Sequence, residues 1–275
     1  MEHVVYRDIV TQALREDIGN GDLTTKSIFG NESGEAFITA KEQGILAGMF
    51  IAEEVFAQVD RTLEFKALRN DGDLIDIGDK IAHIKGKISA ILTAERVALN
   101  FLQRMSGIAT ATKNATELIS HTHAGITDTR KTTPGLRILE KYAVRIGGGL
   151  NHRFNLSDMV LIKDNHIKGA GTLTEAVLRV RRNTGFTTKI EVETASIEQV
   201  KEALDCGVDI IMLDNMSAAD MEAAVKLIAK RTLIEASGGI TYDRLLEVAN
   251  TGVDIISLGY LTSSVTCLDM SLTLS

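Results

Sequence analysis

Cations gather between residues 128 and 168 of an otherwise acidic chain. This stretch holds eight lysines and arginines against four acids, whereas the rest of the chain has 22 basic and 33 acidic residues. Clustered cations in a cleft focus their field on one spot, so the stretch predicts a site for a small, highly charged anion. A broad basic face, which nucleic acid requires, is not indicated. The net charge of −7 also argues against anionic membranes.

Five side chains make up the cationic half of the predicted site. They are Arg130, Lys131, His152, Arg153 and Lys163. Groups of this kind hold carboxylates or phosphates through charge-assisted, often bidentate contacts. The substrate expected here therefore carries several negative charges.

Glu193 and Asp214 make up the acidic half, 21 residues apart on successive predicted strands. Carboxylates that face an anionic substrate hold a divalent metal, hold sugar hydroxyls or stabilise a cationic transition state. Later in the chain, Ser237, Gly238 and Gly259 can present backbone amides to a phosphate. These residues predict an enzyme that acts on a phosphorylated, multiply anionic substrate with Mg²⁺, although their spacing does not name the reaction.

The elements that must position these residues alternate between strand and helix after residue 125. Six apolar runs are expected to form strands, at residues 126–131, 159–165, 189–195, 210–215, 233–239 and 255–261. Strands buried on both faces with helices between them indicate a parallel sheet. A repeat favours a barrel, because EALDCGVDIIMLDN recurs 45 positions later as EVANTGVDIISLGY. The carboxyl ends of barrel strands share one mouth, which is the predicted active site.

The first part of the chain has a different pattern. Residues 33–92 alternate with a period of two and indicate an antiparallel sheet with one helix at residues 49–60. Thr93 is expected to cap a further helix through residue 107. On its polar face, Arg96 and Arg104 are open to solvent or to a neighbouring subunit.

Composition limits the remaining possibilities. With 275 residues and 44% hydrophobic content, the chain can bury one large core or two smaller ones. The sequence has no run of 18 apolar residues that could span a bilayer, and its N-terminal segment is too charged for a signal peptide. A cytoplasmic protein is therefore expected. Cys206 and Cys267 lack metal spacing and are expected to be buried free thiols.

Two smaller features have structural explanations. Arg137, Lys141 and Arg145 recur at helical spacing and are expected to line an exposed helix face, with Arg137 and Lys141 possible phosphate contacts. His166 follows the cationic strand end and is expected to cap the next segment.

Several ordered motifs resemble the quinolinate phosphoribosyltransferase family. They are EDIGNGDLTT, ERVALNFLQRMSGIAT, DTRKTTPGLR, EKYAVRIGGGLNHRFNLSDMVLIKDNHI, EVE, LDN, EASGGI and LGYLT. The resemblance covers nearly the whole chain. It implies an N-terminal α/β sandwich, residues 1–107 joined by 266–275, and an incomplete α/β barrel catalytic domain, residues 108–265.

The resemblance also implies a reaction and an assembly. Phosphoribose would pass from 5-phosphoribosyl 1-pyrophosphate to the ring nitrogen of quinolinate, and nicotinate mononucleotide, pyrophosphate and CO₂ would leave. This is a step of de novo NAD biosynthesis. Each site would be shared between the subunits of a homodimer, and higher oligomers are possible.

Roles follow by matching positions. The residues that match quinolinate contacts are Arg130, His152, Arg153 and Lys163, with Arg96 from the neighbouring subunit. Lys131 matches a lysine between the two substrates, and Glu193 and Asp214 match acids that face the ribose and its metal, Mg²⁺. Ser237, Gly238 and Gly259 match loops near the 5-phosphate. Ser263 departs from the family, which has a histidine after the final LT.

Two alternatives stay open. A related group associated with molybdenum transport shares some of the motifs and would use another aromatic acid, although the full cation set favours a dicarboxylate. The chain could also be a non-catalytic barrel that binds a phosphometabolite, but the presence of both Glu193 and Asp214 argues against this reading.

Overall fold

A computed structural model describes residues 3–275, with side-chain burial described from Tyr6 onward. The chain forms two compact units. Unit 1 comprises Met1–Lys113, Thr132–Gly148 and Leu261–Ser275, and unit 2 comprises Asn114–Lys131 and Gly149–Tyr260. The domain boundaries inferred from the resemblance stay a prediction.

Unit 1 contains an antiparallel sheet built from both ends of the chain. Its order is β12 (Met270–Leu274), β1 (Ser33–Ala40), β5 (Lys80–Lys87) and β3 (Glu64–Ala67). β2 (Gly44–Ile45) and β4 (Leu74–Ile75) form a separate pair. Ala36, Ile38 and Ala40 are fully buried along β1 while their neighbours are partly exposed, as an alternating strand predicts.

The helices of unit 1 include α1 (His3–Ile18), α2 (Leu23–Ile28), α3 (Met49–Val59) and α5 (Arg137–Ile146). The longest helix of the described chain, α4 (Ile88–Leu118), begins earlier than expected. Thr93 is therefore inside the helix and not its cap, and its hydroxyl donates to Asp22 Oδ2 at 3.2 Å. The prediction was wrong because the apolar residues 88–92 continue the helical pattern of α4 and not the strand before it.

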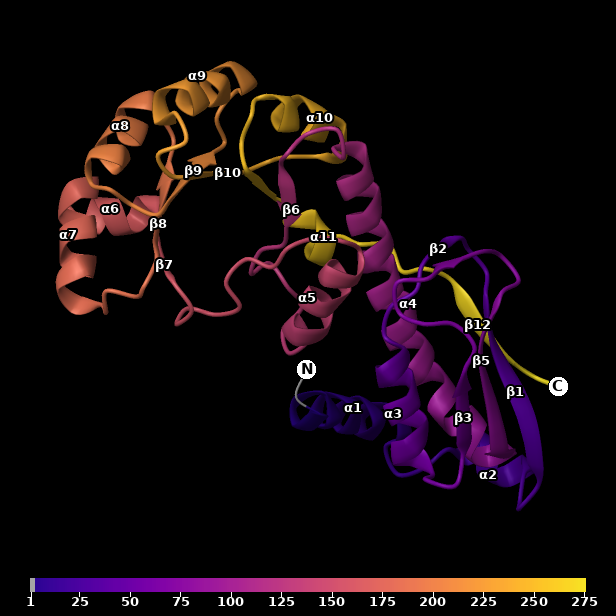
Figure 1. The fold of residues 1–275 in the computed structure, drawn as a ribbon. Coiled ribbons are helices and arrows are strands. Elements are labelled where there is room, and N and C mark those ends of the chain that lie inside the picture. The colour runs from indigo at the N-terminus through magenta and orange to yellow at the C-terminus, as the bar shows by residue number, and fades with distance from the viewer. Residues whose placement is uncertain (1–2) are drawn as a thin grey trace. The chain divides into compact units, whose positions relative to one another are not determined.

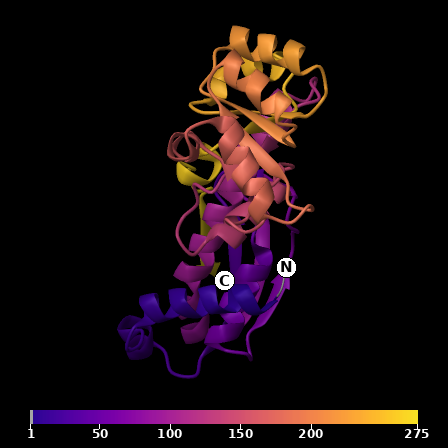
Figure 2. The same ribbon diagram turned by 90° about the vertical axis from the view of Figure 1, so that its left-hand side faces the viewer.

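Unit 2 is a six-stranded parallel sheet with helices between its strands (Figures 1 and 2). The strand order is β6 (Gly125–Thr127), β11 (Ile255–Ser257), β10 (Leu233–Ser237), β9 (Ile210–Asp214), β8 (Ile190–Thr194) and β7 (Val160–Ile162). The intervening helices are α6 (Asp164–Ala170), α7 (Leu173–Asn183), α8 (Ile197–Asp205), α9 (Ala218–Ile228) and α10 (Tyr242–Asn250). A short helix, α11 (Tyr260–Ser263), follows β11. The strands β6 and β7 are the two edges, so the predicted incomplete α/β barrel is confirmed.

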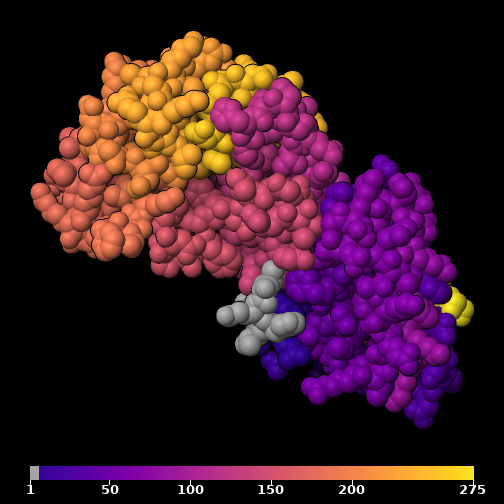
Figure 3. Space-filling view, in the orientation of Figure 1, coloured from indigo at the N-terminus to yellow at the C-terminus, as the bar shows by residue number. Residues whose placement is uncertain are grey.

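Capping serines explain where two helices of unit 2 begin. Ser196 and Ser217 cap α8 and α9 by accepting from the backbone amides of Gln199 and Asp220. Helices α8 and α9 lie outside the sheet, and their orange atoms form part of the surface of unit 2 in the space-filling view (Figure 3).

The sequence repeat has a structural counterpart. Asp209, which precedes β9, accepts from the amide of Ile190 at 2.8 Å. Asp254, at the same place in the second copy, accepts from the amide of Ile234 at 2.9 Å. Each aspartate thus ties the start of its strand to the neighbouring strand. No helix in the described part of the chain is both long and apolar enough to cross a membrane.

Candidate functional site at the carboxyl edge of the parallel sheet

The pairing register places the acidic candidates and Ser237 on one face of the sheet. Glu193 pairs with Met212, and Asp214 pairs with Ser237. Because successive side chains alternate between faces, Glu193, Asp214 and Ser237 all project to the same side, which we call the inner face. All three lie at or next to the carboxyl ends of their strands and are half-buried.

Lys163 links the cationic and acidic halves. It follows β7, and its Nζ forms an ion pair with Glu193 Oε1. The backbone amide of Lys163 donates to His166 Nδ1 at 2.9 Å, which confirms the predicted cap. The start of α6 is thereby fixed with Lys163 turned toward Glu193.

Arg153 is held by backbone as well as by charge. Its Nη1 donates to the carbonyl of Met159 at 3.1 Å. Burial lowers the pKa of the Arg153 guanidinium, and the positive charge of Arg130 lowers it further, while Glu191 and Glu193 act in the opposite direction. Two positive charges that act on each other in this way suit a ligand with two negative charges.

Two glycines shape the backbone beside these side chains. A Cβ on Gly259 would lie 3.0 Å from Lys131 Cδ, so the glycine leaves room for that side chain. Gly238 has a φ of +85°, and a Cβ there would lie 2.5 Å from Asn215 Cγ. Asn215, which follows Asp214 directly, also has a positive φ, of 56°. The loops after β9 and β10 thus pack against each other.

Sequence reasoning missed a buried layer below this edge. Glu191 is two residues before Glu193, roughly 7 Å deeper along β8. Its Oε2 lies 3.1 Å from His152 Nε2, and Glu235 Oε2 lies 3.5 Å from the same nitrogen. The two glutamates are 0% and 3% exposed. A signal was present, because each is a charged residue inside a strand expected to be buried on both faces.

Glu235 has a strongly altered acidity. Burial, followed by the neighbouring charge of Glu191, raises its pKa to about 7, although His152 acts in the opposite direction. The cause is physical: a buried carboxylate loses hydration, and a second carboxylate nearby makes ionisation still harder.

Two sets of residues offer ligands for a cation. Glu193 and Asp214 supply half-buried carboxylate oxygens on the inner face, the hard ligands that Mg²⁺ prefers, so they fit the expected ion. Within the described residues, His152, Glu191 and Glu235 also place one ligand atom each within 4.8 Å of one another. Their mixed nitrogen and oxygen donors suit a transition metal better than Mg²⁺.

The structure does not gather every predicted residue in unit 2. Arg96 lies on the exposed side of α4, in unit 1. The basic helix α5 also belongs to unit 1, so the basic stretch is divided between the units. The prediction that α5 exposes its basic residues was wrong for Lys141, which is buried, whereas Arg145 is exposed. Both cysteines are free as expected, but the predicted burial was wrong, since Cys206 is half-buried and Cys267 is exposed.

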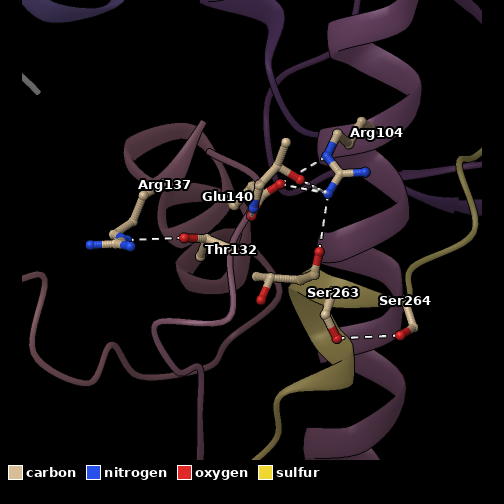
Figure 4. Close-up of polar contacts among 8 residues, drawn as sticks. Arg104, Thr132, Arg137, Glu140, Ser263 and Ser264 are labelled. Atoms are coloured by element: carbon tan, nitrogen blue, oxygen red, sulfur yellow. Dashed lines mark hydrogen bonds and ion pairs between the residues drawn. The ribbon is translucent and has the colours of Figure 1, made fainter. Parts of the chain in front are cut away.

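Arg104 has a structural role in place of the expected solvent-facing one (Figure 4). Its Nη2 donates to Glu140 Oε1 at 2.6 Å and to the carbonyl of Thr262 at 3.0 Å. The buried Glu140 also accepts from the amide of Thr133 at 3.0 Å. This network joins α4, α5 and the segment that follows Arg130 and Lys131 in the chain. In the same view, Ser263 contacts Ser264, hydroxyl to hydroxyl at 3.2 Å.

The fold and the charges define a class of protein: a barrel enzyme with cations and carboxylates at the carboxyl edge of its parallel strands. Family models agree with this class along most of the chain. The N-terminal domain of quinolinate phosphoribosyl transferase matches residues 22–106, and its C-terminal domain matches residues 108–273. The chain therefore belongs to the quinolinate phosphoribosyltransferase family.

Individual relatives agree with this assignment. A probable nicotinate-nucleotide pyrophosphorylase [carboxylating] of Bacillus subtilis is 47% identical, over 99% of this chain and 94% of its own length. A mitochondrial quinolinate phosphoribosyltransferase [decarboxylating] of Nicotiana tabacum is 45% identical, over 97% of this chain and 81% of its own. The solved nicotinate-nucleotide pyrophosphorylase of Francisella tularensis is 37% identical with a TM-score of 0.96, covering 100% of this chain and 98% of the other.

Proposed function

We propose that this protein transfers phosphoribose from 5-phosphoribosyl 1-pyrophosphate to the ring nitrogen of quinolinate and releases nicotinate mononucleotide, pyrophosphate and CO₂. The observation that carries the proposal is the inner face of unit 2, where the cation Lys163 pairs with the carboxylate Glu193 and where the positive charge of Arg130 lowers the pKa of Arg153. Cations suit a dicarboxylate, and carboxylates suit a ribosyl centre that becomes positive in the transition state.

Quinolinate is assigned to the cations. Arg130, Arg153 and Lys163 would hold its two carboxylates, with His152 beside them. Arg96 would come from the neighbouring subunit of a homodimer, and its exposure on α4 supports this assignment. Two ring carboxylates need several cations, which is why one arginine would not suffice.

The sugar donor is assigned to the acids and glycines. Glu193 and Asp214 would face the ribose and Mg²⁺, and bound Mg²⁺ would neutralise charge on the pyrophosphate leaving group. Lys131, whose side chain lies beside Gly259, would lie between the two substrates. Ser237 and Gly238 would bind the 5-phosphate through their hydroxyl and amide groups.

Decarboxylation needs no further catalytic group. After transfer, the ribosylated ring nitrogen carries a positive charge beside C2. When the bond from C2 to its carboxylate breaks, CO₂ leaves and the electron pair stays at C2, next to that charge. A proton from solvent then completes the product. The protein has to hold the reactants in the orientation that leads to reaction.

The cytoplasm is the proposed location. Both cysteines are free, and free thiols are typical of a reducing compartment. The net charge of −7 fits a protein that does not adhere to nucleic acid or anionic lipid.

The test uses quinolinate labelled in its 2-carboxylate, with 5-phosphoribosyl 1-pyrophosphate and Mg²⁺. We expect labelled CO₂ and nicotinate mononucleotide in equal amounts, and loss of both in Asp214→Asn. A nucleotide made from another aromatic acid, with none from quinolinate, would overturn the assignment of quinolinate as the substrate. No product from any acid, despite binding of the sugar donor, would indicate a non-catalytic barrel.

A further inference from the structure

The buried glutamates Glu191 and Glu235, which contact His152, have no part in the reaction as assigned above. Within the described residues, Glu191 Oε1 and Glu235 Oε1 are buried without a hydrogen-bond partner, and Glu191 Oε2 has in place of one an ion-pair contact with His152 Nε2. Burying carboxylates in this way costs stability, because each loses hydration without a full replacement. Two such residues side by side therefore point to a function that outweighs their cost.

The ring of His152 is oriented from both of its nitrogens. Nδ1 accepts from the backbone amide of Arg153 at 2.7 Å. A nitrogen that accepts carries no proton, so the ring proton is on Nε2. That nitrogen faces Glu191 at 3.1 Å and Glu235 at 3.5 Å. The two carboxylates thus select the tautomer that leaves Nδ1 able to accept.

The backbone of His152 is fixed separately from its ring. Its amide donates to Asp128 Oδ1 at 3.0 Å, and Asp128 is fully buried after β6. The preceding segment is tied to the same strand, since the amide of Leu150 donates to the carbonyl of Ile126 at 2.7 Å. Strand β6 holds the chain here, whereas β8 and β10 hold the ring.

We propose that Glu191 and Glu235 are positioning residues for substrate binding: they orient the His152 ring, and the ring in turn fixes Arg153 at the quinolinate subsite. This inference rests on the proposed function of the site. Because both ring nitrogens face protein groups, His152 contributes to binding through Arg153, and its own contact with a carboxylate would require the ring to turn.

Isosteric variants test the kinetic consequence. Glu191→Gln and Glu235→Gln keep the shape and remove the carboxyl groups that select the tautomer. We expect KM for quinolinate to rise on the order of tenfold, with kcat and KM for 5-phosphoribosyl 1-pyrophosphate changed less than about threefold. The melting temperature should not fall, because the buried charges are themselves costly. Glu222→Gln, at an exposed glutamate of α9, is the matched control and should match wild type.

A double-mutant cycle tests whether the glutamates act through His152. His152→Asn keeps an amide oxygen near the place of Nδ1, which can still accept from Arg153, but it removes Nε2. If Glu191 acts through the ring, adding Glu191→Gln to His152→Asn should raise KM for quinolinate no further. Additive effects would overturn the proposal, as would unchanged KM with a lower melting temperature.

A spectroscopic readout separates this proposal from the function on which it rests. In protein labelled with ¹⁵N-histidine, the signals lost in His152→Asn should report a neutral ring protonated at Nε2. In the double variant Glu191→Gln/Glu235→Gln, they should shift toward a mixture of tautomers. Identical spectra would refute the positioning role even if the wild type were inactive. A stoichiometric transition metal that Glu191→Gln releases would also refute it, in favour of a metal site.

Discussion

Gly238 shows how closely the backbone is fixed where the phosphate would bind. Its φ of +85° is one that side chains disfavour, and any Cβ would collide with Asn215. The residue that directly precedes it, Ser237, is half-buried on the inner face. A small change here should therefore be felt in both stability and binding.

Gly238→Ala should destabilise the protein by about 1–3 kcal/mol and raise KM for 5-phosphoribosyl 1-pyrophosphate more than KM for quinolinate. Gly169→Ala is the control, because Gly169 lies in α6 with open space around its Cα. That variant should be neutral or slightly stabilising. Urea unfolding measures the stability, and initial rates measure the KM values. Equal stability and equal KM values in the two variants would contradict the claim that the loop at Gly238 cannot accommodate a side chain.

Glu235 makes stability depend on pH. Its pKa in the folded protein is raised to about 7. At pH values between the ordinary pKa of a glutamate and 7, Glu235 is therefore ionised in the unfolded chain but still protonated in the folded protein. The stability of wild type relative to Glu235→Gln should therefore fall as pH rises through this window, by up to about 3 kcal/mol, and level off above it. Unfolding curves at pH 4.5, 6 and 8 measure the difference, and a constant difference would contradict the assignment.

The elements of the fold were largely predictable, because apolar runs with helices between them indicate a parallel sheet. The cations and acids at strand ends were also found from spacing. Glu191 and Glu235 were not, since an acid within a buried strand gives no sign of which side chain from elsewhere meets it. The start of α4 was missed for a similar reason, because the apolar residues 88–92 fit strand and helix equally well.

The pairing of α4 with α5 through Arg104 and Glu140 also depends on tertiary structure. Arg104→Met should leave a buried carboxylate unpaired and destabilise the protein by about 3–5 kcal/mol. Arg7→Met, which removes a more exposed partner of Glu54, should cost less than about 1 kcal/mol. Thermal unfolding compares them, and similar melting temperatures would show that the network stabilises little.

At the scale of the whole molecule, a site shared between subunits can be tested by mixing two inactive variants of the chain. Arg96→Ala and Asp214→Asn should each be nearly inactive alone. Mixed dimers formed after joint unfolding and refolding should regain activity, because one of their two sites receives Arg96 from one chain and Asp214 from the other. Activity that stays at the level of the separate variants would place Arg96 and Asp214 in the same subunit's site, or Arg96 in none.

The last strand of the chain, β12, pairs with the first, β1, along five residue pairs from Ala36–Leu274 to Ala40–Met270. During synthesis, β1 leaves the ribosome long before its partner exists, and at about 5–20 residues per second the wait is on the order of tens of seconds. For that time one edge of the sheet stays open to pairing with other chains. Production of this protein should thus depend on whatever shields a nascent edge, and slower translation should favour aggregation.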